Sequence, residues 1–164
     1  MKKHILIILS CTMIAFVLLS ISMQILHKNE AKAMQKALTA TMPVSNSLKG
    51  LKENTPSVFI AFHPECEHCQ YEAKSINERH NDLENVNIVM FTVANDSMTK
   101  AFSKQYGLDS LKNVHVLAHT TREMERLFDV KTIPTVFIYN AQNQLVKRYN
   151  GETKIEAILK HVQQ

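Results

Sequence analysis

Two cysteines, Cys66 and Cys69, carry the most informative chemistry in this sequence. They flank Glu67 and His68 and lie where an apolar segment, residues 57–62, is expected to give way to a helix. Two thiols at this spacing can close a small disulfide and reopen it, and the unpaired N–H groups and dipole of a helix start favour a thiolate on the first thiol. Zinc sites use the same spacing. The motif therefore predicts either redox exchange or metal binding.

In the redox interpretation, Cys66 is the attacking thiol because it comes first, at the helix start. Exchange then proceeds through a mixed disulfide with the substrate, which Cys69 resolves. Protonated His68 supports a thiolate on Cys66, whereas Glu65 and Glu67 oppose it by like-charge repulsion. We therefore expect a site of intermediate oxidising power, suited to reducing or exchanging disulfides.

The composition limits the alternatives. The 164 residues contain three cysteines, and Cys11 lies in an N-terminal apolar stretch, so a scaffold held together by many disulfides is excluded. The net charge is +4, and no cluster of lysine and arginine alternates with aromatic residues, so nucleic-acid binding is not expected. With 45% hydrophobic and 21% charged residues, the rest of the chain is typical of one globular domain with a core.

The N-terminus contains an apolar run from Ile5 to Leu26, preceded by two lysines. Its 22 residues would span roughly 33 Å as a helix, enough for a hydrocarbon core of about 30 Å. We expect a transmembrane helix that anchors the domain on the extracytoplasmic side, either periplasmic or at the cell surface. The alternative is a cleavable signal, cut after Ala33, that secretes the domain.

The chain is expected to comprise a membrane anchor or signal segment (1–26), a stalk and the loop leading into the domain (27–50), and the domain itself (51–164). Hydrophobic patterns predict five strands, at 58–62, 86–93, 114–117, 135–139 and 144–149. Helices are expected after Cys66, at 98–106, at 120–128 and at the C-terminus. The order predicts an α/β sandwich whose last two strands form a hairpin.

Several local signals refine these elements. The helix after Cys66 places Cys69, Ala73, Ile76, His80 and Leu83 on one apolar face, which predicts a partly buried core position for His80. Gly107 is expected to terminate the helix at 98–106. Two capping boxes are predicted, by Thr120 with Glu123 and by Thr153 with Glu156.

Three segments together resemble the thioredoxin-like superfamily: Phe62-His63-Pro64-Glu65-Cys66-Glu67-His68-Cys69 after a strand, Thr132-Ile133-Pro134-Thr135 before one, and Gly151 ahead of the final helix. The resemblance covers roughly residues 50–164 and implies a three-layer sandwich around a central mixed sheet. The long interval between Cys66 and Pro134 leaves room for an extra strand and helix, as in membrane-anchored TlpA and ResA-like thiol-disulfide oxidoreductases.

This resemblance implies an extracytoplasmic enzyme that reduces or exchanges disulfides of exported proteins. Its redox centre would be a Cys66–Cys69 disulfide, with no other cofactor. Its partners would be proteins with disulfides or dithiols, and a membrane or soluble thiol that donates electrons.

The resemblance also assigns roles to individual residues. Pro134 would be cis, lie against the cysteine motif and expose the backbone of Ile133, with Thr135, for pairing with substrate. Glu72, three residues after Cys69, would accept its proton, although an ordinary solvated helix glutamate fits the same spacing. Glu65, Glu67 and His68 would tune the thiols. Unlike the family pattern, the chain has Glu65 in place of an aromatic residue, Ile60 in place of a buried acid, and His68 in place of proline.

Two other functional classes stay open at this level. The cysteines together with His63, His68, His115 or His119 could bind copper or another metal, as in Sco-like members of the superfamily, although those have wider cysteine spacing. His115 and His119 are expected to straddle a strand end, where a spacing of four does not converge. The third class is an interaction module whose cysteines are incidental. A peroxiredoxin is not expected, because His63 replaces the threonine three residues before its reactive cysteine.

Overall fold

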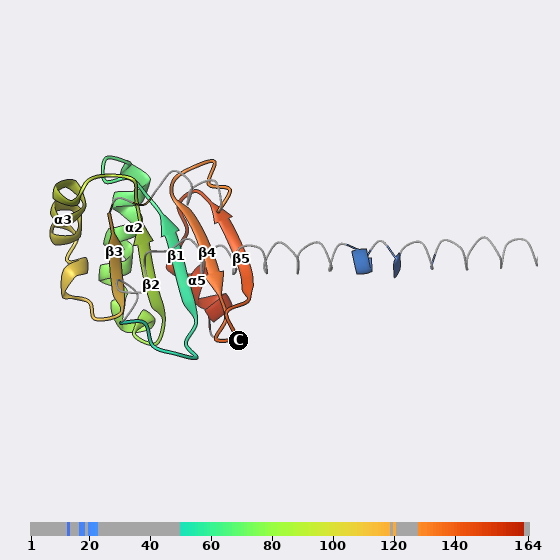
Figure 1. The fold of residues 1–164 in the computed structure, drawn as a ribbon. Helices are drawn as coiled ribbons and strands as arrows, with labels where there is room; N and C mark the ends of the chain where they lie inside the picture. Colours follow the sequence, from blue (N-terminus) through green and yellow to red (C-terminus); the bar gives the residue numbers. More distant parts are fainter. Residues whose placement is uncertain are drawn as a thin grey trace, which may run out of the picture.

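The computed structural model describes residues 50–118, 120 and 128–162, and also residues 13, 17, 18 and 20–22. Within the described domain, a five-stranded sheet packs against helices (Figure 1). The strands are β1 (Ser57–Ala61), β2 (Asn87–Phe91), β3 (Val114–Leu117), β4 (Thr135–Tyr139) and β5 (Leu145–Asn150). The helices are α2 (Glu67–Glu78), α3 (Asp96–Gln105), α5 (Ile155–Val162) and two 3₁₀ helices, His80–Leu83 and Leu108–Ser110.

The sheet is mixed, with strand order β3-β2-β1-β4-β5. The first three strands run parallel and need crossover connections, which α2 and α3 provide. β4 is antiparallel to both β1 and β5, so the predicted mixed sheet and terminal hairpin are confirmed. Ala61 at the end of β1 pairs with Thr135 at the start of β4. This register brings the residues that follow β1 next to those that precede β4.

Side chains alternate between the two faces of the sheet. Val58 and Ile60 of β1 join a core cluster with residues from α2, α3 and α5. Phe59 and Ala61 face the other way, into a cluster in which Phe128 contacts the rings of Phe59, Phe91 and Phe137. The helix predicted over residues 120–128, which would complete the third layer, lies largely outside the described residues.

Helix α2 packs on the sheet through Cys69, Ala73 and Ile76, all at most 1% exposed. The prediction for His80 is wrong, because this side chain is exposed. The α-helix ends at Glu78 and the chain continues as a 3₁₀ helix, so the spacing of four residues no longer keeps His80 on the buried face. Its Nδ1 lies 2.8 Å from the carbonyl oxygen of Asn77 instead.

The ends of the other helices depend on local hydrogen bonds. Asn95 caps α3 by accepting from the backbone N–H of Met98, and Gly107 follows that helix with a φ of +68°, as its predicted role requires. The predicted capping box at Thr153 is wrong, because α5 begins only at Ile155 and the Thr153 hydroxyl donates to the carbonyl of Gly151. The box predicted at Thr120 depends on Glu123, outside the described residues.

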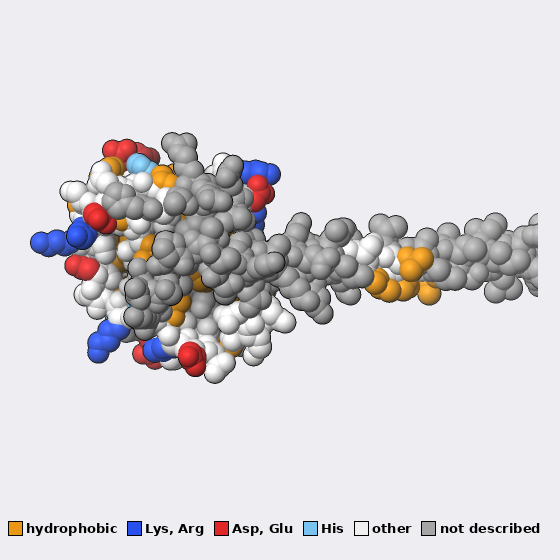
Figure 2. Space-filling view, viewed as in Figure 1, with side chains coloured by type: hydrophobic (Ala, Val, Ile, Leu, Met, Phe, Trp, Pro, Cys, Tyr) orange, Lys and Arg blue, Asp and Glu red, His pale blue; other side chains and the backbone are white. Residues whose placement is uncertain are grey.

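The described residues of the N-terminal segment, between 13 and 22, are helical, and the Ser20 hydroxyl donates to the carbonyl of Val17. Across the described part of the chain, no helix reaches the length and hydrophobicity that a membrane crossing requires. The rest of the predicted anchor and stalk lies outside the described residues. On the visible face of the domain, basic and acidic side chains are interspersed (Figure 2), as the modest net charge suggests.

Candidate active site

Cys66 ends the loop after β1 and is the N-cap of α2. Its backbone is extended, with φ −82° and ψ 116°, and its sulfur accepts a hydrogen bond from the backbone N–H of Cys69 at 3.3 Å. The sulfur therefore takes the place of the side-chain oxygen that usually caps a helix. Cys66 is half-buried and its thiol is free. An accessible sulfur at a helix start is well placed to act as a nucleophile.

The segment before β4 faces this thiol. The Ile133–Pro134 peptide bond is cis, as predicted, and Pro134 is buried. The Cys66 thiol donates to the carbonyl oxygen of Ile133, with 3.8 Å between sulfur and oxygen. The side chain of Ile133 is 39% exposed, whereas Thr135 is completely buried and its hydroxyl donates to the carbonyl of Thr132. Ile133 thus lies at the surface beside the Cys66 thiol, and Thr135 lies beneath it with a hydrogen bond to Thr132.

Cys69 lies behind Cys66 and is completely buried, with a free thiol. Burial, with a smaller contribution from its contact with Cys66, raises the pKa of the Cys69 thiol well above its ordinary value. This thiol therefore holds its proton, and it needs a nearby acceptor before it can attack a mixed disulfide.

Glu72, one turn after Cys69, is the predicted acceptor. It is 1% exposed, so the interpretation as a solvated helix glutamate is wrong. Neither carboxyl oxygen has a hydrogen-bond partner. Burial raises the pKa of Glu72 to about 8; the backbone N–H of Thr153 acts in the opposite direction, and the charge of Glu152 adds to the increase. A carboxyl with this pKa can exchange protons near neutral pH.

The three residues predicted to tune the thiols, Glu65, Glu67 and His68, occupy the exposed side of the site. Glu65 and Glu67 are exposed, and a Glu65 oxygen lies 3.9 Å from Nδ1 of His63. His68 is also exposed, and its Nδ1 lies 2.9 Å from Oε2 of Glu152. Sequence reasoning missed Glu152, which lies 84 positions after His68. The one available signal was its position next to Gly151, which the family pattern includes.

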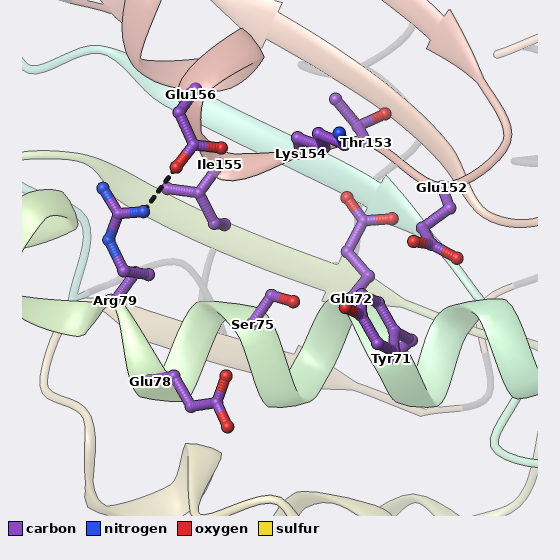
Figure 3. Close-up of a pocket in the computed structure, with 10 residues that line it drawn as sticks. All are labelled: Tyr71, Glu72, Ser75, Glu78, Arg79, Glu152, Thr153, Lys154, Ile155 and Glu156. Atoms are coloured by element: carbon purple, nitrogen blue, oxygen red, sulfur yellow. Dashed lines mark hydrogen bonds and ion pairs between the residues drawn. The ribbon is translucent and has the colours of Figure 1, made fainter.

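A groove of about 310 Å³ runs between α2 and the segment leading into α5 (Figure 3). Glu72 rises from α2 toward Thr153, and Glu152 lies alongside it. An ion pair between Arg79 and Glu156 lies farther along the groove. The buried acid is therefore next to a path that leads toward solvent.

A metal site would need at least three histidine, cysteine or acidic side chains close together. Among the described residues, no such group lies close enough to bind one ion. His115 is on β3, which β2 separates from β1. His119 lies outside the described residues.

Comparisons with known proteins agree with this fold. A sequence profile of the AhpC/TSA family matches residues 28–148. No curated protein matches the chain.

Solved structures with similar folds include a secreted Mycobacterium tuberculosis disulfide oxidoreductase homologous to E. coli DsbE, with 21% identity over 62% of this chain and 73% of that one and a TM-score of 0.52. StoA from Bacillus subtilis has 16% identity over 66% and 83%, with a TM-score of 0.54. A thiol:disulfide interchange protein of the thioredoxin family from Chlorobium tepidum has 20% identity over 73% and 82%, with a TM-score of 0.56. The chain therefore belongs to the AhpC/TSA family and has a thioredoxin-like fold that carries a Cys66–Cys69 pair.

Proposed function

We propose that this protein is a thiol-disulfide oxidoreductase that reduces or exchanges disulfides of exported proteins. The arrangement of the two thiols is the observation that carries the proposal. Cys66 is accessible, caps α2 and contacts the carbonyl of Ile133 beside the cis proline, while Cys69 is buried directly behind it. One thiol can meet a substrate and the other can release it.

The reaction begins when the Cys66 thiolate attacks a substrate disulfide. A bond forms between Cys66 and one substrate sulfur, and the second substrate sulfur leaves as a thiolate and takes up a proton. Cys69 then gives its proton to the Glu72 carboxylate and attacks the Cys66 sulfur. The mixed disulfide breaks, a Cys66–Cys69 disulfide forms, and the remaining substrate sulfur leaves and is protonated. Two electrons have passed from the protein to the substrate.

Substrate contact is assigned to the surface around Cys66. The exposed Ile133 lies beside the reacting sulfur and offers its backbone to an extended substrate segment. Thr135 supports this turn through its hydrogen bond to Thr132. A membrane or soluble thiol donor returns the disulfide to the dithiol for the next cycle.

The proposed location is extracytoplasmic, with residues 1–26 as the anchor. The apolar run from Ile5 to Leu26 supports this assignment. So does the similarity in fold to a mycobacterial disulfide oxidoreductase that is described as secreted.

Insulin reduction with dithiothreitol tests the activity. We expect the wild-type chain to accelerate precipitation of the insulin B chain, Cys66→Ser to abolish this activity, and Cys69→Ser to accumulate a mixed disulfide with the substrate. A Cys66→Ser variant that is as active as wild type would refute the proposal. The reduction potential, measured against glutathione, then gives the direction of electron flow.

A further inference from the structure

Glu152 contacts the cysteine motif from a separate part of the chain. It lies between β5 and α5, yet its Oε2 is 2.9 Å from Nδ1 of His68, inside the motif. Glu152 is 35% exposed and His68 is 73% exposed, so the pair lies at the surface. A His68 N–H at this distance donates a hydrogen bond to the Glu152 carboxylate and offsets part of its charge.

The Glu152 carboxylate also lies beside the buried Glu72. Glu152 and Glu72 line the same groove, and their side chains lie alongside each other (Figure 3). Glu72 is 1% exposed and both of its oxygens are unpartnered. A negative charge on Glu152 therefore opposes the ionisation of a buried carboxyl that only the backbone N–H of Thr153 favours.

The groove extends from the buried Glu72 toward the surface of the domain. Its volume of about 310 Å³ accommodates several water molecules, each occupying about 30 Å³ in the liquid. A proton that Glu72 receives from Cys69 can leave by this route, past Glu152.

We propose that Glu152 is a positioning residue that couples His68 in the cysteine motif to the buried carboxyl of Glu72, so that its charge adds to the effect of burial and raises the pH at which Glu72 can accept the proton of Cys69. The catalytic value of this coupling rests on the proposed function. The effect of Glu152 on the ionisation of Glu72 can be measured without enzymatic turnover. The step is a proton transfer: the Cys69 S–H bond breaks, an O–H bond forms on Glu72, and that proton later passes to water in the groove.

The sign of each effect follows from the surrounding charges. Removing the charge of Glu152 lets Glu72 ionise at lower pH. Removing His68 takes away the hydrogen bond that offsets part of the charge of Glu152, and this moves the ionisation of Glu72 to higher pH. The other titratable or charged groups that face Glu72, or line its groove, are Cys69, Tyr71, Glu78, Arg79, Lys154 and Glu156. Arg79 is paired with Glu156 and Asp82, and Glu78 with Lys74, so these residues provide matched controls.

The experiment follows the ¹³C carboxyl resonance of Glu72 against pH in the reduced full chain in detergent, with Glu72→Gln identifying the signal. We expect Glu152→Gln to shift the titration toward lower pH by on the order of half a unit, because water screens a partly exposed charge. Glu152→Asp should largely restore the wild-type curve, and His68→Gln should move it the other way. Glu156→Gln, in the same groove but paired with Arg79, should leave it unchanged.

Equal titration curves for wild type and Glu152→Gln would overturn the inference, as would an equal shift in Glu156→Gln. An unchanged curve in His68→Gln would remove the link to the cysteine motif. The pH profile of insulin reduction should shift with the Glu72 titration. If the wild type reduces no insulin, the proposed function fails. The titration of Glu72 would still show whether Glu152 affects its ionisation.

Discussion

At the residue scale, the site separates an accessible sulfur from a protected one. Cys66 has polar partners in the Cys69 N–H and the Ile133 carbonyl, and it is half-buried. Cys69 is completely buried, and its most direct acidic neighbour, Glu72, is buried too. Keeping both of these groups neutral avoids placing a charge in a medium of low polarity. The transfer itself needs Glu72 as the carboxylate, and it then moves one negative charge from Glu72 to Cys69 without adding a second charge to the core.

The buried acid has a consequence for stability. Its folded-state pKa of about 8 is above the ordinary 4.5, so between these values the folded chain holds a proton that the unfolded chain has lost. The free energy of unfolding should therefore decrease as pH rises through this window, by at most about 1.4 kcal/mol per unit of pKa difference. In Glu72→Gln this decrease should disappear, leaving the variant more stable than wild type at pH 8.5. Urea unfolding of the reduced chain at pH 5 and pH 8.5 measures this, and parallel pH dependence in both proteins would contradict it.

At the element scale, the site depends on two chain segments that the sheet brings together. The antiparallel register of β1 with β4 sets Ala61 beside Thr135, so the loop carrying Cys66 meets the Ile133–Pro134 bond. Helix α2 then holds Cys69 and Glu72 against the sheet through Ala73 and Ile76. The positions of Cys69 and Glu72 therefore depend on the packing of α2 against the sheet.

Truncating the side chain of Ile76 tests this dependence. The residue is 1% exposed in the core, so Ile76→Ala should lower the free energy of unfolding by about 2–5 kcal/mol. Tyr71→Ala is the matched control, because this side chain lies on the same helix but is 60% exposed, and its effect should stay within about 0.5 kcal/mol. Chemical denaturation measures both variants. Similar losses in the two would mean that α2 is not held by its buried face.

The sequence predicted those elements whose signal lies within a short segment. The runs at 114–117 and 135–139 predicted β3 and β4 with their observed bounds, since both are mostly apolar, although only β4 is buried along its whole length. The change from α-helix to 3₁₀ helix before His80 was not readable, because it depends on how the chain turns toward β2. The contact between His68 and Glu152 was also hidden, since it depends on tertiary packing between elements far apart in sequence.

At the scale of the whole molecule, the described residues of the core all come from the domain that follows the N-terminal segment. Both core clusters consist of residues between Leu51 and Val162, and the sheet lies wholly within that range. A domain that buries its own apolar surface should fold without residues 1–26. The apolar run from Ile5 to Leu26 then has a separate role, which we expect to be membrane attachment.

Deleting residues 1–26 separates these two roles. We expect the full chain to stay in the membrane pellet after alkaline carbonate extraction, because burying about 20 apolar residues in lipid is effectively irreversible. The shortened chain should be soluble and should reduce insulin at the wild-type rate per molecule, since Cys66, Cys69 and Glu72 keep their places. A full chain that is extracted by carbonate would argue for a signal that is cleaved after Ala33. A shortened chain that is soluble but inactive would instead show that the N-terminal segment contributes to the site.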